Sequence, residues 1–257
     1  MTDKDRTKPT RRFSDRVADY AKYRPGYPEA LIPYLAERCA LPPRAQVADI
    51  GSGTGIFTKM LLDAGFSVSA VEPNDEMRAH AEAVYTVENA FRSVNGSAEE
   101  TTLPDRAFDL VVCAQAFHWF DVDKTRAEFA RILKPDACAA LIWNNRLTDV
   151  DGFARAYEIL LGEKGSDYTE VNHAKQPVER FERFFRDGRF HLQKFHNRQD
   201  FDLDGLLGRA FSSSYVPARE TQEGQGFARE LEWIFARYAQ NGRVAFVYQT
   251  LVYSGQI

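Results

Sequence analysis

The sequence is poor in cysteine. It contains three, Cys39, Cys113 and Cys138, an odd number that follows no metal-binding or disulfide spacing. This usage fits a reducing compartment and argues against a disulfide-stabilised secreted fold. No apolar run approaches the roughly 20 residues that cross a bilayer, and the N-terminus lacks the apolar core of a signal peptide. We therefore expect a cytoplasmic protein with no membrane partner.

An excess of positive charge is also missing. Lys and Arg number 33 against 37 Asp and Glu, which gives a formal net charge of −4. A broad nucleic-acid-binding face needs a surplus of basic residues, so we expect no nucleic-acid partner. Hydrophobic residues at 44% and charged residues at 27% are typical of a folded globular chain. We interpret residues 1–257 as a single domain that begins with a flexible tail over residues 1–12.

The dinucleotide-binding fingerprint G-x-G-x-x-G is absent as well, although its setting is present. An apolar-leaning run from residue 46 reaches Asp49 and then breaks into Gly51, Gly53 and Gly55, after which residues 56–62 have helical spacing. This order predicts a strand, a tight turn and a helix that present backbone N–H groups to a ligand. The third glycine comes one residue too early for the dinucleotide fingerprint, and the acid at Asp49 is a second departure from it.

The run Asp49–Gly55 resembles motif I, D-x-G-x-G-x-G, of the class I S-adenosylmethionine-dependent methyltransferases. The resemblance implies that S-adenosyl-L-methionine is the cofactor and that the turn binds it. The residues implied at this turn are Asp49, Gly51, Ser52, Gly53 and Gly55.

A second motif stands at the predicted distance. Residues 67–71 alternate as a strand that ends at Glu72, and parallel strands present their carboxyl ends at one edge of the sheet. Glu72 is thus predicted to face the glycine turn, where a carboxylate can accept hydrogen bonds from both ribose hydroxyls. The resemblance further implies that Met77 contacts adenine, that Glu99 bonds the adenine amino group, and that Pro73 and Ala98 lie at the cofactor site.

The segment Tyr20–Pro28 supplies a third element of the pattern. Its sequence follows the pattern Y-x-x-Y-R-P-x-Y-P. This pattern is similar to the N-terminal segment of small-molecule methyltransferases of the trans-aconitate type, in the type 11 branch. In those enzymes the segment folds over the cofactor, which implies cofactor contacts for Tyr20 and Arg24. An ordinary helix-entry turn remains the alternative interpretation, because two prolines and a glycine stop any helix here.

Strands and helices alternate over the middle of the chain, which indicates an α/β fold with a parallel sheet. Further strands are predicted at residues 91–95, 108–114 and 137–143, then 190–195 and 244–253. The resemblance implies a Rossmann-like, doubly wound sheet of seven strands in the order 3-2-1-4-5-7-6, with the last strand antiparallel. We expect a cofactor-binding core over residues 45–145 and a helical cap built from insertions at 150–185 and 203–240.

The aromatic run after the fourth predicted strand is the candidate reaction site. Gln115 is implied at the cofactor, and Phe117 and Trp119 are expected to wall the acceptor pocket. His118 titrates near neutrality, so it is a candidate base for a hydroxyl acceptor, or simply a structural histidine. The Asn/Asp-Pro-Pro-Tyr/Phe signature of amide and adenine N-methyltransferases is absent. The histidines form no metal-binding constellation, and we assign no metal.

The acceptor is predicted to be a small molecule methylated at oxygen, through either a carboxylate or a hydroxyl. Arg146 follows the fifth predicted strand, and its planar guanidinium can hold a carboxylate by two hydrogen bonds, together with Arg24. Alternatively, Arg24 holds the cofactor's own carboxylate and Arg146 is solvated. A cofactor-binding protein without transferase activity, and a nicotinamide-nucleotide oxidoreductase, are the two alternative functions.

Overall fold

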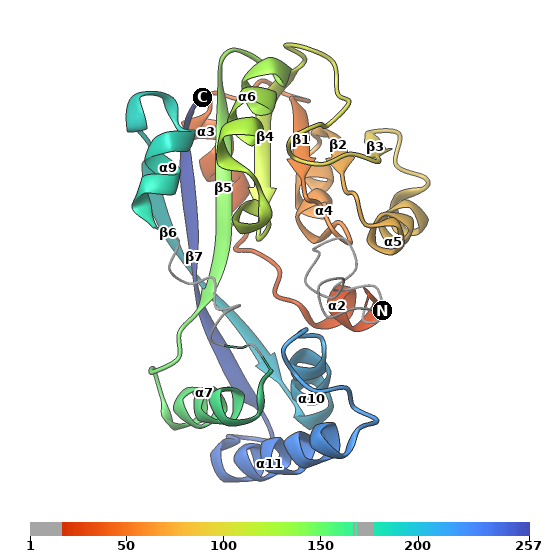
Figure 1. The fold of residues 1–257 in the computed structure, drawn as a ribbon, viewed down its shortest axis with the longest axis vertical. Coiled ribbons are helices and arrows are strands. Elements are labelled where there is room, and N and C mark those ends of the chain that lie inside the picture. The colour runs from red at the N-terminus through yellow and green to blue at the C-terminus, as the bar shows by residue number, and fades with distance from the viewer. Residues whose placement is uncertain (1–16, 167, 169–176) are drawn as a thin grey trace.

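One mixed sheet runs through the computed structural model, which describes residues 17–166, 168 and 177–257 (Figure 1). The predicted tail at residues 1–12 lies outside the described residues. The strands are β1 (Gln46–Ile50), β2 (Ser67–Val71), β3 (Phe91–Val94), β4 (Phe108–Ala114), β5 (Leu133–Arg146), β6 (His191–Phe201) and β7 (Val244–Gln256). Their order is β3-β2-β1-β4-β5-β7-β6, with β1 to β5 parallel and β7 antiparallel to both neighbours. The predicted topology is confirmed.

Helices cover both faces of this sheet and one end of the molecule. They are α2 (Val17–Tyr23), α3 (Leu31–Arg38), α4 (Ile56–Asp63), α5 (Asp75–Tyr85), α6 (Val122–Ile132), α7 (Gly152–Lys164), α9 (Val178–Phe184), α10 (Leu203–Phe211) and α11 (Gln222–Tyr238), with 3₁₀ turns η2 (Phe117–Trp119) and η3 (Arg186–Gly188). None of the helices among the described residues is long and apolar enough to cross a membrane.

The two faces of the sheet have separate hydrophobic clusters. On one face Phe129 of α6 and Phe184 of α9 pack on β4 and β5, and on the other Leu35 of α3 and Leu61 of α4 are fully buried. Burial on both sides explains why β4 has an almost continuous apolar sequence. Side-chain caps fix where two helices begin: Asn74 Oδ1 accepts from the N–H of Met77 at 2.9 Å, and Asp121 caps α6 in the same way.

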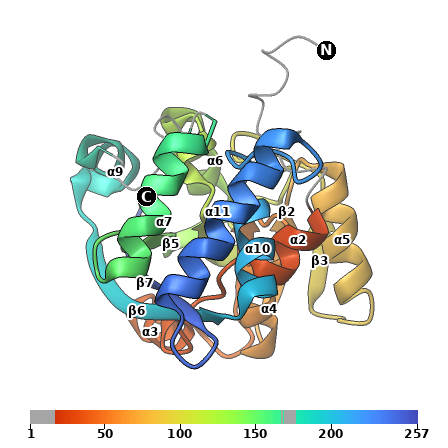
Figure 2. The same ribbon diagram turned by 90° about the horizontal axis from the view of Figure 1, so that it is seen from below.

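The cap packs on the far end of the long β6–β7 hairpin. Helices α7, α10 and α11 surround Phe246, and Figure 2 shows them lying across the lower end of the molecule beside α2. Helix α9 differs from the prediction that grouped residues 150–185 together, because Phe181 and Phe184 pack on the main sheet beside α6. Strand β5 also begins earlier than the predicted 137–143, at Leu133, directly after α6.

Candidate functional site

The turn between β1 and α4 depends on three glycines with positive φ. The φ angles of Gly51, Gly53 and Gly55 are +69°, +58° and +84°, a region that other residues rarely adopt. A Cβ on Gly51 would lie 2.6 Å from the Cβ of Ala116, and one on Gly55 would lie 2.5 Å from the Tyr85 ring. Gly51 and Gly55 therefore pack too closely on their neighbours to carry a side chain. A Cβ on Gly53 would make only an ordinary van der Waals contact, with Met77 Sδ at 3.7 Å.

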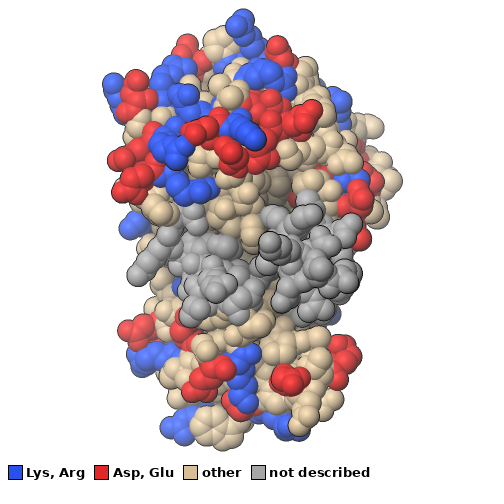
Figure 3. Space-filling view, in the orientation of Figure 1, with Lys and Arg blue, Asp and Glu red and all other residues tan. Residues whose placement is uncertain are grey.

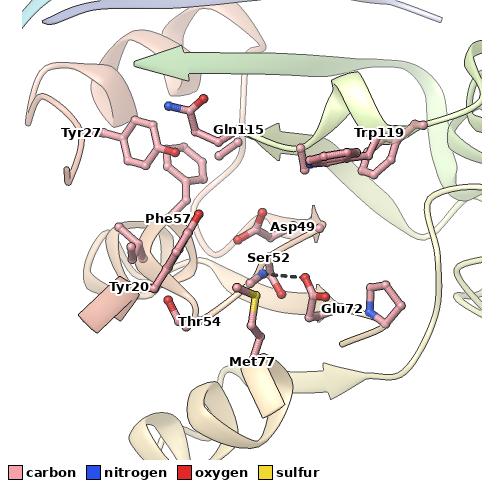
Figure 4. A pocket seen from close by; sticks show the side chains of 17 residues that line it. Tyr20, Tyr27, Asp49, Ser52, Thr54, Phe57, Glu72, Met77, Gln115 and Trp119 are labelled. Atoms are coloured by element: carbon pink, nitrogen blue, oxygen red, sulfur yellow. Dashed lines mark hydrogen bonds between the residues drawn. The ribbon is translucent and has the colours of Figure 1, made fainter. Parts of the chain in front are cut away.

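Glu72 is held at the end of β2 by backbone donors. Its Oε2 accepts from the N–H of Gly53 at 2.9 Å and its Oε1 accepts from the N–H of Asn74 at 2.8 Å. Burial raises the pKa of Glu72, an effect that these two hydrogen bonds oppose. Figure 4 shows the carboxylate beside the glycine turn, with the bond to Gly53 dashed. The predicted proximity of Glu72 to the turn is thus observed.

Asp49, near the carboxyl end of β1, is fully buried. Its Oδ2 accepts from the hydroxyl of Thr58 at 2.6 Å, whereas Oδ1 has no hydrogen-bond partner among the described residues. Burial raises the pKa of Asp49 to about 7; the bond from Thr58 opposes this shift and the charge of Glu72 adds to it. A buried acceptor without a donor is costly, so Oδ1 suits a ligand that brings an N–H or O–H group.

These groups open onto a cavity of about 120 Å³. Figure 4 shows side chains converging on it from the glycine turn, from the N-terminal segment at Tyr20 and Tyr27, and from Trp119 after β4. The predicted cofactor-binding residues that line it are Tyr20, Asp49, Gly51, Ser52, Gly53, Glu72, Pro73, Met77 and Gln115. Tyr27, Thr54 and Phe57 also line the cavity but were not predicted. The only signal for them in the sequence is that they lie next to the predicted motifs.

Four predicted cofactor residues do not line this cavity, and one of them, Arg24, lines the second cavity described below. Gly55 packs behind the cavity, where its carbonyl accepts from the Tyr85 hydroxyl at 2.9 Å. Ala98 is buried in the hydrophobic cluster beside α6, and Glu99 Oε1 accepts from the N–H of Asp121 at 3.0 Å. Neither Ala98 nor Glu99 is among the residues that line the cavity. The roles of Ala98 at the cofactor and of Glu99 at the adenine amino group stay predictions from the sequence.

A second cavity, of about 390 Å³, adjoins the first and separates the sheet from the cap. Tyr20, Tyr27 and Gln115 line both cavities. The predicted residues His118, Trp119, Arg146 and Arg24 line the second one.

Phe117 does not line either cavity, which corrects its assignment as a pocket wall. Its ring is fully buried and lies 4.7 Å from that of Phe184, because the 3₁₀ turn η2 directs residue 117 inward and residues 118 and 119 toward the cavity.

The chain between α2 and α3 is pinned against this site. The carbonyl oxygen of Gly26 accepts from Asn144 Nδ2 at 3.0 Å and from Asn197 Nδ2 at 2.8 Å. Arg24 continues α2 by donating its N–H to the carbonyl of Tyr20, and its guanidinium stacks 4.8 Å over the Tyr20 ring. The segment therefore lies over both cavities.

Arg146 is held at the carboxyl end of β5 with one side left open. Its Nη2 donates to Glu158 Oε2 at 2.6 Å and to the Tyr168 hydroxyl at 3.2 Å, and the guanidinium stacks 4.9 Å over Tyr157. Its Nη1 is buried and has no acceptor among the described residues. The side chain is thus oriented by its neighbours, which excludes the alternative of a solvated loop residue.

Arg209 of α10 is a further site residue that the sequence did not predict. It is 6% exposed, and its Nη1 donates to Ser213 Oγ at 3.1 Å. Arg24 Nη2 donates to the carbonyl of Ser212 at 3.2 Å. Both arginines have a buried Nε with no acceptor in the part of the chain that the structure describes. Nothing in the helical pattern of residues 203–211 distinguishes an arginine directed inward from one in solvent.

The three arginines give the second cavity a positive field. Burial lowers the pKa of Arg24, and the charge of Arg209 lowers it further. Burial acts to raise the pKa of Tyr215, but attraction by Arg209, Arg24 and Arg146 outweighs it and the net shift is downward. Of the described residues that line this cavity, Glu158 is the only acidic one, and it is paired with Arg146. The cavity therefore suits an anion.

Comparison with known protein families matches the part of the chain that contains the glycine turn and Glu72. Residues 48–141 match the family described as "Methyltransferase domain". An uncharacterized methyltransferase of Mycobacterium tuberculosis is 35% identical over 153 residues, which are 60% of this chain and 60% of that protein. The chain thus spans about 60% of the length of the first curated relatives that it matches.

Two further relatives extend over nearly the whole chain. An uncharacterized methyltransferase of Schizosaccharomyces pombe is 26% identical over 255 residues, covering 96% of this chain and 97% of that protein. A structure from Anaeromyxobacter dehalogenans, described as a type II methyltransferase, has a TM-score of 0.68 at 23% identity and covers 91% of this chain and 98% of the other. At this level of identity, the likeness to this structure shows a shared fold and nothing more.

Proposed function

We propose that the chain is a class I S-adenosylmethionine-dependent methyltransferase that methylates a carboxylate oxygen of a small organic acid. The cofactor is S-adenosyl-L-methionine. The observation that carries the acceptor class is the cluster of Arg24, Arg146 and Arg209, each with a buried donor that lacks an acceptor among the described residues.

The residues of the first cavity fit the cofactor group by group. Glu72, fixed by two backbone N–H groups, would accept from the ribose hydroxyls. The open Oδ1 of Asp49 and the buried hydroxyl of Thr54, which also has no partner among the described residues, would accept from or donate to the polar methionine end. Met77, 6% exposed in the cavity wall, offers an apolar surface to adenine.

The cofactor supplies an electrophilic methyl group, which an ionised carboxylate can accept without prior loss of a proton. The chain's own task is then to bind and orient the acid. Arg146 is held in place by Glu158 and Tyr157, so its open Nη1 is preorganised as a donor. The side chains of Tyr20 and Trp119 line the junction of the two cavities and would exclude water from it.

An acceptor screen tests the proposal. The purified protein and labelled cofactor are incubated with small mono-, di- and tricarboxylic acids, phenols, alcohols and amines. We expect label to enter a carboxylic acid as a base-labile ester. If no acid is methylated and a neutral acceptor is, the carboxylate assignment is wrong.

The arginine cluster is tested on the acid found by that screen. Arg146→Lys should raise the KM for the acid by about ten- to 100-fold, because lysine keeps the charge but loses the planar pair of donors. Affinity for S-adenosylhomocysteine should stay unchanged. Arg155→Lys, on the exposed side of α7, is the matched control. The same KM in both variants would remove Arg146 from acid binding.

A hydroxyl acceptor is the second candidate, favoured by the position of His118 in the wall of the same cavity. A histidine acting as base contributes roughly 10²–10⁴-fold to turnover. With a carboxylate acceptor, His118→Gln should instead reduce turnover only modestly and leave its pH profile unchanged. A loss of the larger size on a hydroxyl substrate would favour the second candidate.

The predictions about binding partners and cellular location are part of this proposal. A small-molecule acceptor, without nucleic acid, is supported by the charge distribution on the face in Figure 3, where basic and acidic side chains are interspersed. The cytoplasmic location and the single domain stay predictions from the sequence.

A further inference from the structure

A second cluster of reactive side chains lies away from both cavities described above. Cys39 caps the C-terminus of α3, and Cys138 lies near the start of β5. Both line a third cavity, of about 410 Å³, which shares no lining residue with the other two. Arg146 ends the same strand eight residues later, and at about 3.3 Å per residue this separates the clusters by roughly 25 Å.

The two thiols are paired. Their side chains share a hydrogen bond, and both belong to the hydrophobic cluster between α3 and the sheet. Cys138 is 8% exposed and Cys39 is half-buried, so a small reagent in the cavity reaches them while bulk solvent is restricted. Cys113, in contrast, is fully buried within β4.

Charged groups line the same cavity as the two thiols. Arg38 directly precedes Cys39, Arg186 bonds to the carbonyl of Ile257 and to Asp136, and Arg189 pairs with Asp187. Three cations thus oppose two acidic side chains, and the excess favours a thiolate and an anionic reagent.

The electrostatics distinguish the two sulfurs. The hydrogen bond from Cys39 lowers the pKa of Cys138 to about 7; burial opposes this shift and the charge of Arg38 supports it. The same hydrogen bond raises the pKa of Cys39, and burial adds to it. Cys138 is therefore the nucleophile, and Cys39 is the thiol that can resolve a mixed disulfide.

We propose that Cys39 and Cys138 form a redox-active dithiol, a modification site for small anionic disulfides of the glutathione type. The Cys138 thiolate attacks the disulfide, forming a mixed disulfide and releasing one thiolate. Cys39, on losing its proton, attacks the Cys138 sulfur and releases the second thiol. In sum the protein dithiol loses two electrons and two protons to the small disulfide, which becomes two thiols, and α3 becomes joined to β5.

The test uses the full chain and glutathione disulfide at pH 7.5, with peptide mass mapping after acid quenching. Wild type should lose two hydrogens in mass and yield linked peptides containing Cys39 and Cys138, with Cys113 still a thiol. Cys39→Ser should stop at the mixed disulfide on Cys138, and Cys138→Ser should give neither product. Arg38→Gln should slow the first step by about two- to fivefold, because less thiolate is present.

Two outcomes overturn the proposal. One is that both cysteines remain thiols in the folded protein while urea-unfolded protein is oxidised under the same conditions. The other is that Cys39→Ser accumulates no mixed disulfide, although its thermal unfolding shows that it is folded. This site is independent of the acceptor assignment, because its products are detected without any turnover.

Discussion

At the scale of single residues, two buried carboxylates at the ends of neighbouring parallel strands have opposite hydrogen-bonding states. Each carboxylate oxygen of Glu72 accepts a hydrogen bond from a backbone N–H group, whereas Oδ1 of Asp49 has no donor among the described residues. The first is therefore a rigid acceptor for a neutral hydroxyl pair, and the second is a buried polar group whose open oxygen a ligand can satisfy.

For Glu72, the substitution to Gln keeps the size and removes the charge. An amide cannot accept from both the Gly53 and Asn74 N–H groups, so the side chain should lose its orientation. We expect affinity for S-adenosylhomocysteine to fall by 1.5–3 kcal/mol, or roughly ten- to 150-fold. Isothermal calorimetry measures it, with the exposed Glu88→Gln as control. Unchanged affinity would exclude Glu72 from the ribose site.

Asp49 should make stability depend on pH in a predictable direction. Its pKa of about 7 in the native state exceeds the ordinary value of about 4 in the unfolded chain. Between these values the native state keeps a proton that the unfolded state loses, so the free energy of unfolding falls as pH rises from about 4 to 7.

The measurement is the thermal midpoint of the cofactor-free protein from pH 4 to 8. The midpoint of Asp49→Asn minus that of wild type should rise through this window and level off above it. Asp63→Asn, exposed at the end of α4, should show no such trend. Parallel curves for wild type and Asp49→Asn would contradict the raised pKa.

Residue-level prediction succeeded where a side chain is fixed by the end of a strand. Glu72 and Arg146 each lie at the carboxyl edge of the sheet, so the sequence predicts their side of the molecule. Phe117 and Arg209 were not predictable in this way. A 3₁₀ turn decides which aromatic residue points inward, and the packing of α10 on β7 decides where an arginine is buried.

At the scale of elements, the β1–turn–α4 unit allows the effect of strain to be separated from the effect on the site. Gly53 and Gly65 both have positive φ, +58° and +82°, and a Cβ at Gly65 would meet nothing within 4 Å. Alanine at either position should lower the free energy of unfolding by about 1–2 kcal/mol, the penalty of the left-handed conformation.

The two variants should differ in binding. A Cβ on Gly53 would enter the wall of the first cavity beside Met77, so Gly53→Ala should also weaken binding of S-adenosylhomocysteine, while Gly65→Ala should not. Urea unfolding and calorimetry on the same preparations measure both effects. Equal affinities in the two variants would show that the turn's role is purely conformational.

Element types were predictable because the apolar periodicities are long, whereas boundaries and neighbours were less so. The α6–β5 junction has no loop: α6 ends at Ile132 and β5 begins at Leu133, with Asp136 at φ +60° where the sequence indicates a turn. The phenylalanine face of α9 predicts burial but not the partner, because both the sheet and the cap have a hydrophobic cluster on which it could pack.

At the scale of the whole molecule, α2 connects the two halves of the site. Its residues pack against α10 of the cap and α5 of the cofactor core, and Tyr20 lines both cavities. In Figure 1 the helix lies between the sheet and the cap. The position of this short helix should therefore couple cofactor binding to the shape of the acceptor cavity.

The contact between α2 and α10 depends on Gly208, because any Cβ there would overlap the ring of Tyr23. Gly208→Ala should move α2 away from the cap and lower the free energy of unfolding by about 1–3 kcal/mol, the usual penalty of overpacking. It should also weaken binding of S-adenosylhomocysteine, because Tyr20 moves with the helix. Gly162→Ala, in α7 of the same cap with open space around it, should instead be neutral or stabilising by up to about 1 kcal/mol. Calorimetry and urea unfolding give both quantities, and adding Tyr23→Ala to Gly208→Ala should restore part of the affinity by removing the overlap. A destabilised Gly208→Ala protein with wild-type affinity would show that α2 covers the site without positioning it.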